Sequence, residues 1–446
     1  MKIIIAGAGE VGYHLAKLLR KESHNVVLID TRASILTRAD SELDLLTIHG
    51  NAYSISILDK AGVSDTDLLI AVTSSETANL TIATIGKQLG AKKTISRVNS
   101  SEFHKLKDRL DLDKLGIDVV ISPEELASKE IIRLLKRSAF SNAFDFEFGK
   151  LTLLGVYLEE GSSIIEKRVS DFMSFDLKNQ YKVIALERNG IPIIPDQDFV
   201  YLKNDHVFFL CLPSGIEQIR ELCGKRKLDV NNVMILGGGN IGYNSAKKLS
   251  RKKHVKLIES DSERCQELAD KLPDTLVIND DGHNVHHLED ENISEMDAFI
   301  AVTGNSETNI MSCLVAKNHG VKKTIAMVEN IDYINLSQTI GIDTLINKKL
   351  IAANNIFRYV RRADILNIAG IHGIDAEAIE IQVNQNSKVT QKTIGELKLP
   401  NDAVIGGIIR NDEGIIAYPA FQIDANDKVV IFALPDSIKK TLAHFN

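Results

Sequence analysis

Short apolar runs alternate along this chain with longer segments in which apolar residues recur at helical spacing. Residues 3–6 form an uninterrupted apolar run, and Val11, Leu15 and Leu19 follow it at the period of an amphipathic helix. In the N-terminal part this alternation predicts strands at 2–6, 25–29, 45–48, 68–72, 93–97 and 118–121, and helices at 10–21, 33–40, 54–61, 76–89, 101–110 and 124–137. Such an order predicts an α/β, doubly wound fold with a parallel sheet covered on both faces.

Much of this pattern recurs later in the chain at a nearly constant offset. The segment GAGEVG at 7–12 returns as GGGNIG at 237–242, which lies 230 residues further on (237 − 7). Three more pairs repeat at similar offsets: LLIAVT at 68–73 and AFIAVT at 298–303, GAKKTI at 90–95 and GVKKTI at 320–325, and LGID at 115–118 and IGID at 340–343. Matches at constant offset through segments of different sequence indicate an internal duplication.

Each copy is followed by a segment of different character. From about residue 140 to 222, short alternating apolar runs are separated by turn signals such as Arg188-Asn189-Gly190. Residues 375–446 repeat this pattern. Both segments are therefore predicted to be small α+β modules. We expect four domains: a Rossmann-like nucleotide-binding domain at 1–138, a small α+β module at 139–222, a second Rossmann-like domain at 230–362 and a second small module at 363–446.

The first glycine-rich segment carries candidate chemistry. Gly7, Gly9 and Gly12 have G-x-G-x-x-G spacing between a strand and a helix, which suits a tight turn, close approach to a pyrophosphate and close helix packing. The pyrophosphate is expected at the helix N-terminus, where N–H groups are unpaired. The residues between the glycines belong to the same candidate loop: Ala8, Glu10 and Val11.

An acidic residue stands where such a fold holds the ribose of a dinucleotide. Asp30 ends the next predicted strand, 18 residues after Gly12 (30 − 12), and is expected to accept hydrogen bonds from ribose hydroxyls. A carboxylate would repel a 2′-phosphate, so NAD(H) is favoured over NADP although Arg32 is near. The alternative is that Asp30 only caps the helix that starts near residue 33.

Composition narrows the class of protein. A net charge of −7 argues against a nucleic-acid partner and against purely electrostatic attachment to anionic lipid. No apolar run approaches the ~20 residues of a membrane helix, and the N-terminus begins as a strand, so we expect a cytoplasmic protein. Four cysteines without C-x-x-C pairing are expected as reduced thiols: Cys211, Cys223, Cys265 and Cys313.

Taken together, GAGEVG…LID…HGN…AVTSSETAN…RVN and GGGNIG…LIE…AVT…N resemble the tandem units of the TrkA family. This family comprises cytoplasmic regulatory subunits of Trk-type potassium uptake systems, built from regulator-of-potassium-conductance (RCK) domains. The resemblance implies binding of NAD(H) or adenine nucleotides without covalent chemistry on them. It also implies a homo-dimeric or homo-tetrameric ring on the inner face of the membrane, bound to a membrane-embedded Trk-type potassium transporter subunit.

The resemblance also places further residues at the first site. These are Gly50 and Asn51 beside the adenine, Thr73, Glu76 and Asn79 beside the second ribose or the nicotinamide, and Arg97 beside phosphate. Simpler alternatives are a left-handed turn at Gly50, helix capping at Thr73 and a solvated surface charge at Arg97.

The second copy matches less well. Its counterparts of the site are Gly237, Gly239, Asn240, Ile241, Gly242 and Glu259. However, Asp280 replaces Gly50, Asp281 replaces Asn51 and Met327 replaces Arg97. A carboxylate at the adenine rim without an arginine near phosphate weakens binding of an anionic dinucleotide. We therefore predict NAD(H) in the first domain, and NAD(H), ATP or ADP, or no ligand, in the second.

Other polar patterns carry less weight. Tyr13–Lys17 and Tyr243–Lys247 have the Y-x-x-x-K spacing of short-chain dehydrogenases, but they lie on the phosphate-binding helices and not on a later helix facing the nicotinamide. Three histidines are interpreted as part of a solvent-exposed loop and not as a metal site: His283, His286 and His287. Three acidic residues are interpreted as a solvated helix face and not as a cation site: Glu289, Asp290 and Glu291.

Two other functions compete with a regulatory subunit. An NAD-dependent oxidoreductase needs a proton donor facing the nicotinamide, and the motifs contain none. The other is a soluble nucleotide-sensing scaffold without a membrane partner.

The predicted helix 124–137 carries an apolar stripe and has a counterpart near 348–361. The stripe fits either contacts within a ring or an intrachain core; it consists of Leu126, Ile131, Leu134 and Leu135.

Overall fold

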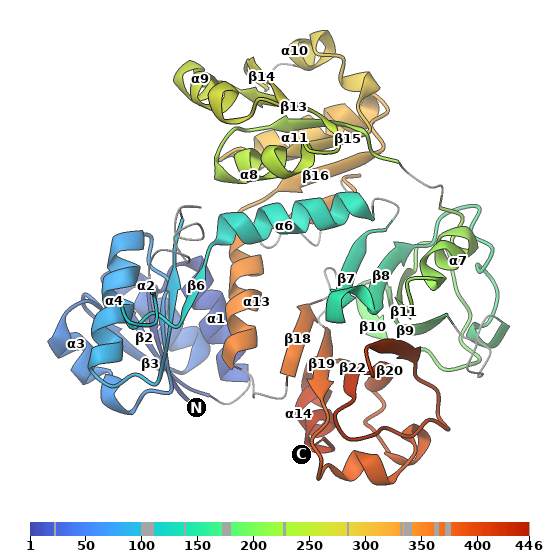
Figure 1. Cartoon of the computed structure of the whole chain (residues 1–446), viewed down its shortest axis with the longest axis horizontal. Coiled ribbons are helices and arrows are strands. Elements are labelled where there is room, and N and C mark those ends of the chain that lie inside the picture. The colour runs from blue at the N-terminus through green and yellow to red at the C-terminus, as the bar shows by residue number, and fades with distance from the viewer. Residues whose placement is uncertain are drawn as a thin grey trace.

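In the part of the chain that it describes, the computed structural model has four β-sheets, two parallel and two antiparallel, arranged around two central helices (Figure 1). The described residues are 1–21, 24–99, 111–137, 140–171, 180–225, 229–282, 285–330, 333, 341–360, 365–370 and 376–445. The predicted helix at 101–110 lies outside these residues. Among the described residues, no helix is both long and apolar enough to cross a membrane.

The first parallel sheet has the strand order β3-β2-β1-β4-β5-β6. We call this sheet and its flanking helices the first unit; its elements are β1 (Lys2–Ala6), α1 (Glu10–Lys21), β2 (Asn25–Asp30), α2 (Ala33–Leu43), β3 (Leu46–His49), α3 (Ile55–Lys60), β4 (Leu68–Ala71), α4 (Glu76–Gln88), β5 (Lys93–Arg97), β6 (Val119–Ile121) and α6 (Pro123–Lys136). Ile3 and Ile5 pack on one face of the sheet and Ile4 on the other, which is why β1 is apolar throughout. The predicted doubly wound α/β fold is confirmed.

The second parallel sheet repeats this order as β14-β13-β12-β15-β16-β17. The elements of this second unit are β12 (Asn232–Leu236), α8 (Asn240–Leu249), β13 (His254–Glu259), α9 (Ser262–Lys271), β14 (Thr275–Asn279), α10 (Val285–Asp290), β15 (Ala298–Ala301), α11 (Ser306–Asn318), β16 (Lys323–Met327), β17 (Thr344–Ile346) and α13 (Lys348–Val360). The strand order changes direction between β12 and β15, as it does between β1 and β4. Ligands of such sheets bind at this switch point, outside the carboxyl ends of the strands.

The two small modules are antiparallel sheets that pack on each other. The first consists of β7 (Asn142–Phe146), β8 (Leu151–Tyr157), β9 (Tyr181–Arg188), β10 (Ile191–Ile193), β11 (His206–Cys211) and α7 (Gly215–Leu222); the second of β18 (Ile365–Gly370), β19 (Glu377–Gln382), β20 (Ala403–Arg410), β21 (Glu413–Ile416), β22 (Lys428–Ala433) and α14 (Pro435–Ala443). Phe208 of the first and Phe432 of the second belong to one buried cluster. Across this interface Lys182 donates to the carbonyl oxygens of Ile405 (3.0 Å) and Ala417 (3.3 Å).

The last helix of each parallel unit is exchanged with the other unit. Ile131 of α6 lies in the core of the second unit with Ile241, whereas Ile356 of α13 lies in the core of the first unit with Leu15. Figure 1 shows α6 crossing between the two units and α13 standing against the first. The apolar stripe on α6 thus serves an intrachain core, and it ties the two halves of the chain together.

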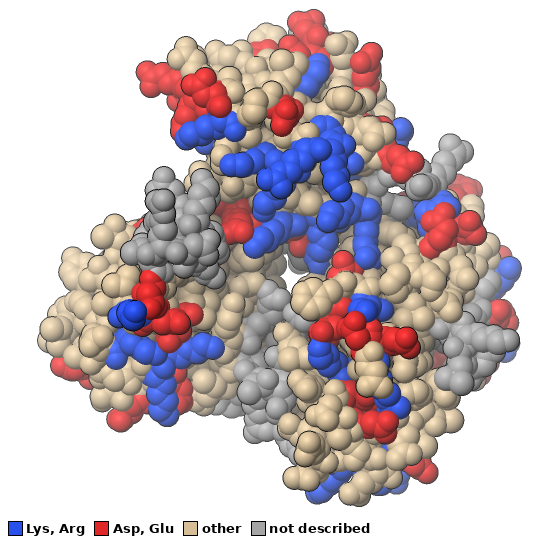
Figure 2. All heavy atoms as spheres, in the orientation of Figure 1, with Lys and Arg blue, Asp and Glu red and all other residues tan. Residues whose placement is uncertain are grey.

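Charge is unevenly distributed over the surface. Lys and Arg side chains gather over α6 and α8 on the face seen in Figure 2, although the whole chain carries −7. Within this region Lys129 pairs with Glu125 at 2.8 Å. The four cysteines are all buried and free, as predicted, and burial raises the pKa of the Cys211 and Cys223 thiols to about 12.

Candidate functional site

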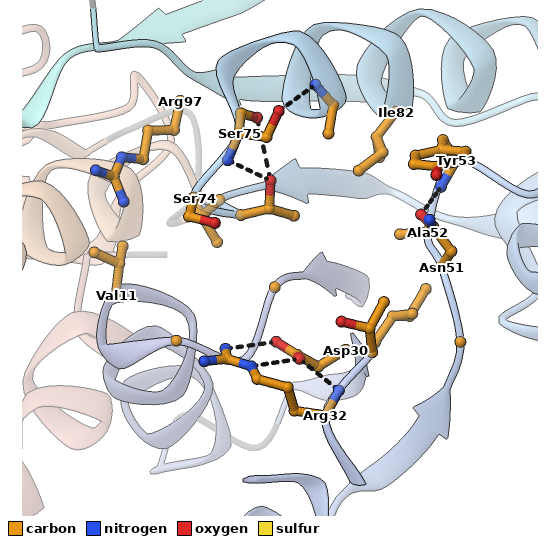
Figure 3. A pocket seen from close by; sticks show the side chains of 18 of the residues that line it. Val11, Asp30, Arg32, Asn51, Ala52, Tyr53, Ser74, Ser75, Ile82 and Arg97 are labelled. Carbon is orange, nitrogen blue, oxygen red and sulfur yellow. Dashed lines mark hydrogen bonds and ion pairs between the residues drawn. The ribbon is translucent and has the colours of Figure 1, made fainter.

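A cavity of about 470 Å³ opens at the carboxyl ends of β1, β2 and β4 in the first unit (Figure 3). Its walls come from the glycine loop, the ends of the strands and the first turns of α1 and α4. The lining residues are Gly7, Gly9, Glu10, Val11, Ile29, Asp30, Thr31, Arg32, Gly50, Asn51, Ala52, Tyr53, Val72, Thr73, Ser74, Ser75, Ala78, Ile82, Arg97 and Lys349. The cavity therefore lies at the switch point of the sheet, where the sequence predicts a nucleotide.

The three glycines of the loop have different surroundings. A Cβ on Gly12 would lie 1.9 Å from the Gly7 carbonyl oxygen, and one on Gly7 would lie 2.8 Å from the Thr73 nitrogen in a backbone with φ of +106°. A Cβ on Gly9 would meet only the Arg32 Nη2 atom, at 3.9 Å. Gly7 and Gly12 are thus required by packing, whereas Gly9 keeps open the approach to the N-terminus of α1. Ala8, between them, is buried and contributes its N–H to the site.

Asp30 is almost fully buried, and all four of its acceptor positions are occupied. Its Oδ2 accepts from the Ala8 N–H (2.7 Å) and Arg32 Nη2 (3.1 Å), and its Oδ1 from the Arg32 N–H (2.9 Å) and Nε (3.0 Å). Burial opposes ionisation, but the Arg32 guanidinium and the two backbone N–H groups outweigh it and lower the pKa of Asp30. Helix α2 has Arg32 and not Asp30 at its N-cap. Asp30 is therefore an ionised acceptor aimed across the glycine loop.

Behind the cavity, polar side chains hold the strand ends together. The Asn79 Oδ1 atom accepts from the Thr73 N–H (2.8 Å) and hydroxyl (2.7 Å), and its Nδ2 donates to the carbonyl oxygens of Thr73 (3.1 Å) and Arg97 (3.0 Å). Glu76 accepts from the Asn99 N–H at 2.7 Å. Neither Asn79 nor Glu76 lines the cavity. Both side chains instead hydrogen bond to backbone groups of the segments that form its walls.

The remaining predicted residues lie on opposite sides of the cavity. Gly50 and Asn51 follow β3, and the Asn51 Oδ1 atom accepts from the Tyr53 N–H at 3.3 Å. Arg97, at the end of β5, lines the other side, and its buried Nε has no hydrogen-bond partner among the described residues. Figure 3 shows Asn51 and Arg97 separated by the width of the cavity. A donor without a partner at this place suits an anionic ligand.

The second unit repeats the backbone features of this site. A Cβ on Gly242 would lie 1.9 Å from the Gly237 carbonyl oxygen, and Gly239 has open space around it. Asn240 and Ile241 begin α8, as Glu10 and Val11 begin α1.

The side chains of the second unit differ from those of the first. Glu259 accepts from the N–H groups of Gly238 (2.7 Å), Ser260 (2.8 Å) and Asp261 (3.0 Å), and among the described residues no arginine forms an ion pair with it. Asp280, at the position of Gly50, pairs with His287 at 2.5 Å. The same backbone thus carries a more acidic set of side chains.

The sequence reasoning did not propose several of the lining residues, among them Tyr53, Ser75, Ile82 and Lys349. Lys349 comes from α13 of the second unit, and its Nζ lies 2.6 Å from Glu10 Oε2. No local pattern identifies it, because it reaches the first unit only through the exchange of α6 and α13.

The other polar patterns take structural roles. The Tyr13 hydroxyl pairs with Glu42, and Tyr243 accepts from Lys247 at 3.1 Å, both away from the cavity. Glu289 and Glu291 are paired with His319 (3.3 Å) and Lys256 (3.3 Å). His283 lies outside the described residues, within which no cluster of three potential metal ligands occurs.

Two family models match the chain, each of them twice. The TrkA-N domain matches residues 3–123 and 233–348, and the TrkA-C domain matches 153–224 and 378–446. The Trk system potassium uptake protein TrkA of Haemophilus influenzae is 35% identical over 438 residues, which cover 97% of this chain and 95% of that protein. A TrkA homolog of Archaeoglobus fulgidus is 33% identical over 443 residues, covering 99% of both chains.

Solved structures share the fold at low sequence identity. The GsuK RCK domain aligns with a TM-score of 0.60 at 16% identity and covers 100% of this chain and 94% of that one. A GsuK channel bound to NAD aligns with a TM-score of 0.60 at 17% identity, covering 100% of this chain and 78% of that one. These similarities establish the tandem arrangement of the fold.

Proposed function

Because the chain belongs to the TrkA family of potassium uptake proteins, we propose that it is a regulatory subunit that binds NAD(H) in its first unit and thereby controls a membrane-embedded Trk-type potassium transporter. The relatives are named as potassium uptake proteins. The proposed role is accordingly to bind the nucleotide and leave it chemically unchanged.

Asp30 is the observation that carries the choice of ligand. Two of its four acceptor positions are held by backbone N–H groups and two by the Arg32 side chain. Two ribose hydroxyls can replace the guanidinium without disturbing the backbone contacts, and each hydrogen bond to a charged acceptor contributes about 1.5–3 kcal/mol. The open space at Gly9 admits the pyrophosphate to the N-terminus of α1. A structural neighbour described as a channel bound to NAD supports this choice.

The other predicted residues keep their proposed places around this ligand. We propose Gly50 and Asn51 for the adenine side and Arg97 for phosphate, with Thr73 at the nicotinamide side. Glu76 and Asn79 are proposed to act indirectly, because they hydrogen bond to backbone behind the cavity. For the second unit we propose weaker binding of NAD(H), ATP or ADP, because Asp280, Asp281 and Met327 replace the first unit's Gly50, Asn51 and Arg97.

The exchanged helices provide a route from nucleotide to pore. A ligand shifts a conformational equilibrium only by its differential affinity for two arrangements, and typical allosteric couplings are ~1–3 kcal/mol. Because α6 and α13 each belong to the core of the other unit, a change in one unit displaces a helix in the other. We propose that a homo-dimeric or homo-tetrameric ring of such chains transmits this displacement on the cytoplasmic face of the membrane.

The proposed division of the chain into domains is 1–138, 139–222, 230–362 and 363–446.

Transport measurements test this function. The chain is reconstituted with a Trk-type membrane subunit from the same organism in vesicles, and potassium uptake is followed with and without NADH. The proposal predicts that uptake depends on the chain and changes with NADH, while the Asp30→Ala variant supports uptake that no longer responds. Co-purification with no membrane subunit and unchanged uptake would instead favour a scaffold without a membrane partner.

A further inference from the structure

We propose that Lys349, a residue of the second unit, is a phosphate ligand of the nucleotide bound in the first unit. The first site is then assembled from both halves of the chain, and the second half supplies one of its cations. This inference rests on the proposed function, because it assumes an anionic nucleotide in the cavity of the first unit.

The position of Lys349 supports this role. Its side chain lines the cavity, and its Nζ lies 2.6 Å from Oε2 of Glu10, the first residue of α1, and 3.4 Å from Oε2 of Glu329. The N-terminus of α1 is where a pyrophosphate is expected, because the glycine loop opens there. The ammonium group is therefore beside the expected phosphates without a change in the backbone.

The backbone of Lys349 is fixed by a buried neighbour. The Lys349 N–H donates to Asn347 Oδ1 at 2.9 Å, and Asn347 Nδ2 donates to the Glu329 carbonyl oxygen at 2.7 Å. Asn347 is 1% exposed. Only the flexible end of the lysine has to move in order to exchange a carboxylate for a phosphate.

The two carboxylates that hold the ammonium group are replaceable. Glu10 and Glu329 have side chains 57% and 51% exposed, whereas that of Lys349 is 23% exposed. Ion pairs with exposed carboxylates contribute little, about 0–1 kcal/mol. A phosphate that enters the less solvated cavity offers a stronger partner, and both carboxylates can then turn to water.

The first copy has the opposite charge at the position that matches Lys349. The segments LGID at 115–118 and IGID at 340–343 are 225 residues apart (340 − 115), so Glu124 is the counterpart of Lys349. Glu124 is 8% exposed, and its Oε2 has no hydrogen-bond partner among the described residues. The duplication thus retains the helix start and reverses the charge at this position.

Nucleotide titrations of the full-length chain test the assignment. Lys349→Met is compared with wild type and with Lys348→Met, a control that removes a charge from the same helical turn. Lys348 does not line the cavity, and its Nζ lies 3.9 Å from Glu124 Oε1. NADH and adenosine are titrated by calorimetry, since adenosine has no phosphate. We expect Lys349→Met to weaken NADH binding roughly tenfold, with adenosine affinity unchanged, and Lys348→Met to change neither. The Lys349→Arg variant should retain most of the NADH affinity.

The outcomes separate this inference from the function on which it rests. If wild type binds NADH and Lys349→Met binds it equally well, the inference is wrong and the proposed function stands. Equal losses for NADH and adenosine would also overturn it, because they indicate a structural defect; thermal melting of each variant identifies misfolding independently. If wild type binds no NADH, the proposed function and this inference both fail.

Discussion

The Arg32 guanidinium forms a two-point ion pair with Asp30, with Nε 3.0 Å from Oδ1 and Nη2 3.1 Å from Oδ2. This pair occupies the acceptor positions that the ribose hydroxyls of a dinucleotide require. Binding therefore includes the breaking of an ion pair, and the arginine acts as a competitor of the ligand.

Replacement of Arg32 by Met removes this competitor. The Arg32 side chain is 55% exposed and that of Asp30 is 6% exposed, so solvent screening and the entropy of holding the arginine offset part of the attraction between them. We therefore expect Arg32→Met to raise NADH affinity about two- to fivefold in calorimetric titrations. A lower affinity would mean that Arg32 itself contacts the nucleotide and that its ion pair with Asp30 does not oppose binding.

Substitutions of two loop glycines should have different effects, one on nucleotide affinity and the other on stability. In Gly9→Ala the new methyl group has space, so we expect an unchanged melting temperature but NADH affinity reduced at least roughly tenfold, because the methyl group occupies the pyrophosphate path. In Gly12→Ala the clash with Gly7 should lower the melting temperature itself. Gly239→Ala is the matched control in the second copy and should leave the melting temperature and the tight NADH binding in the first unit unchanged. Unaltered NADH binding by Gly9→Ala would exclude this loop as the phosphate site.

The exchange of helices makes a prediction about local stability. Ile356→Ala on α13 creates a cavity in the first unit, and Ile131→Ala on α6 creates one in the second, at a cost of roughly 2–5 kcal/mol each. In hydrogen–deuterium exchange we expect Ile356→Ala to accelerate exchange in β1 and α1, and Ile131→Ala to accelerate it in β12 and α8. The reverse pattern would show that each helix packs within its own unit.

A buried lysine gives the fold a pH dependence. Lys323 is 3% exposed, its Nζ donates to the Phe140 carbonyl oxygen at 3.2 Å, and burial lowers its pKa from 10.5 to about 8. Between pH 8 and 10.5 this lysine is protonated in the unfolded chain but neutral in the folded one, so the free energy of unfolding rises with pH through this window. Below pH 8 the folded chain bears the full cost of burying the charged ammonium group. Relative to Lys323→Met, wild type should gain up to roughly 3 kcal/mol between pH 8 and 10.5 in denaturant titrations.

The corresponding lysine of the first unit provides the control for this effect. Lys93 lies over the Tyr359 ring at 5.4 Å and is less buried than Lys323. Lys93→Met, measured in parallel, controls for the removal of an ammonium group at the matching position of the fold. A difference between wild type and Lys323→Met that stays constant from pH 8 to 10.5 would contradict the assignment.

The sequence was sufficient for the parts of this fold that depend on local pattern. The apolar run of β1, the glycine spacing and the position of Asp30 specify a strand, a turn and an acceptor, and the structure brings all three together at one cavity. The duplication doubled this information, because Thr303 and Asn309 repeat the hydrogen bonds of Thr73 and Asn79.

The rest depended on contacts between distant segments. The apolar face of α6 has the same spacing whether it packs on its own sheet or on another, so the sequence could not reveal that Ile131 belongs to the second unit. The contribution of Lys349 to the cavity follows from that exchange. For Asn79, the pattern gave the correct strand end but not the direction of the side chain, which is turned toward backbone groups.

The most direct test of the account is a titration of the full-length chain with NADH, comparing wild type with Asp30→Ala and Glu259→Ala. We predict that wild type binds NADH, that Asp30→Ala loses roughly 100-fold in affinity because two hydrogen bonds to a charged acceptor are missing, and that Glu259→Ala keeps the tight binding event. The NADH absorbance should remain constant throughout. Failure of wild type to bind, equal affinity of Asp30→Ala, or oxidation of the nucleotide would contradict the account.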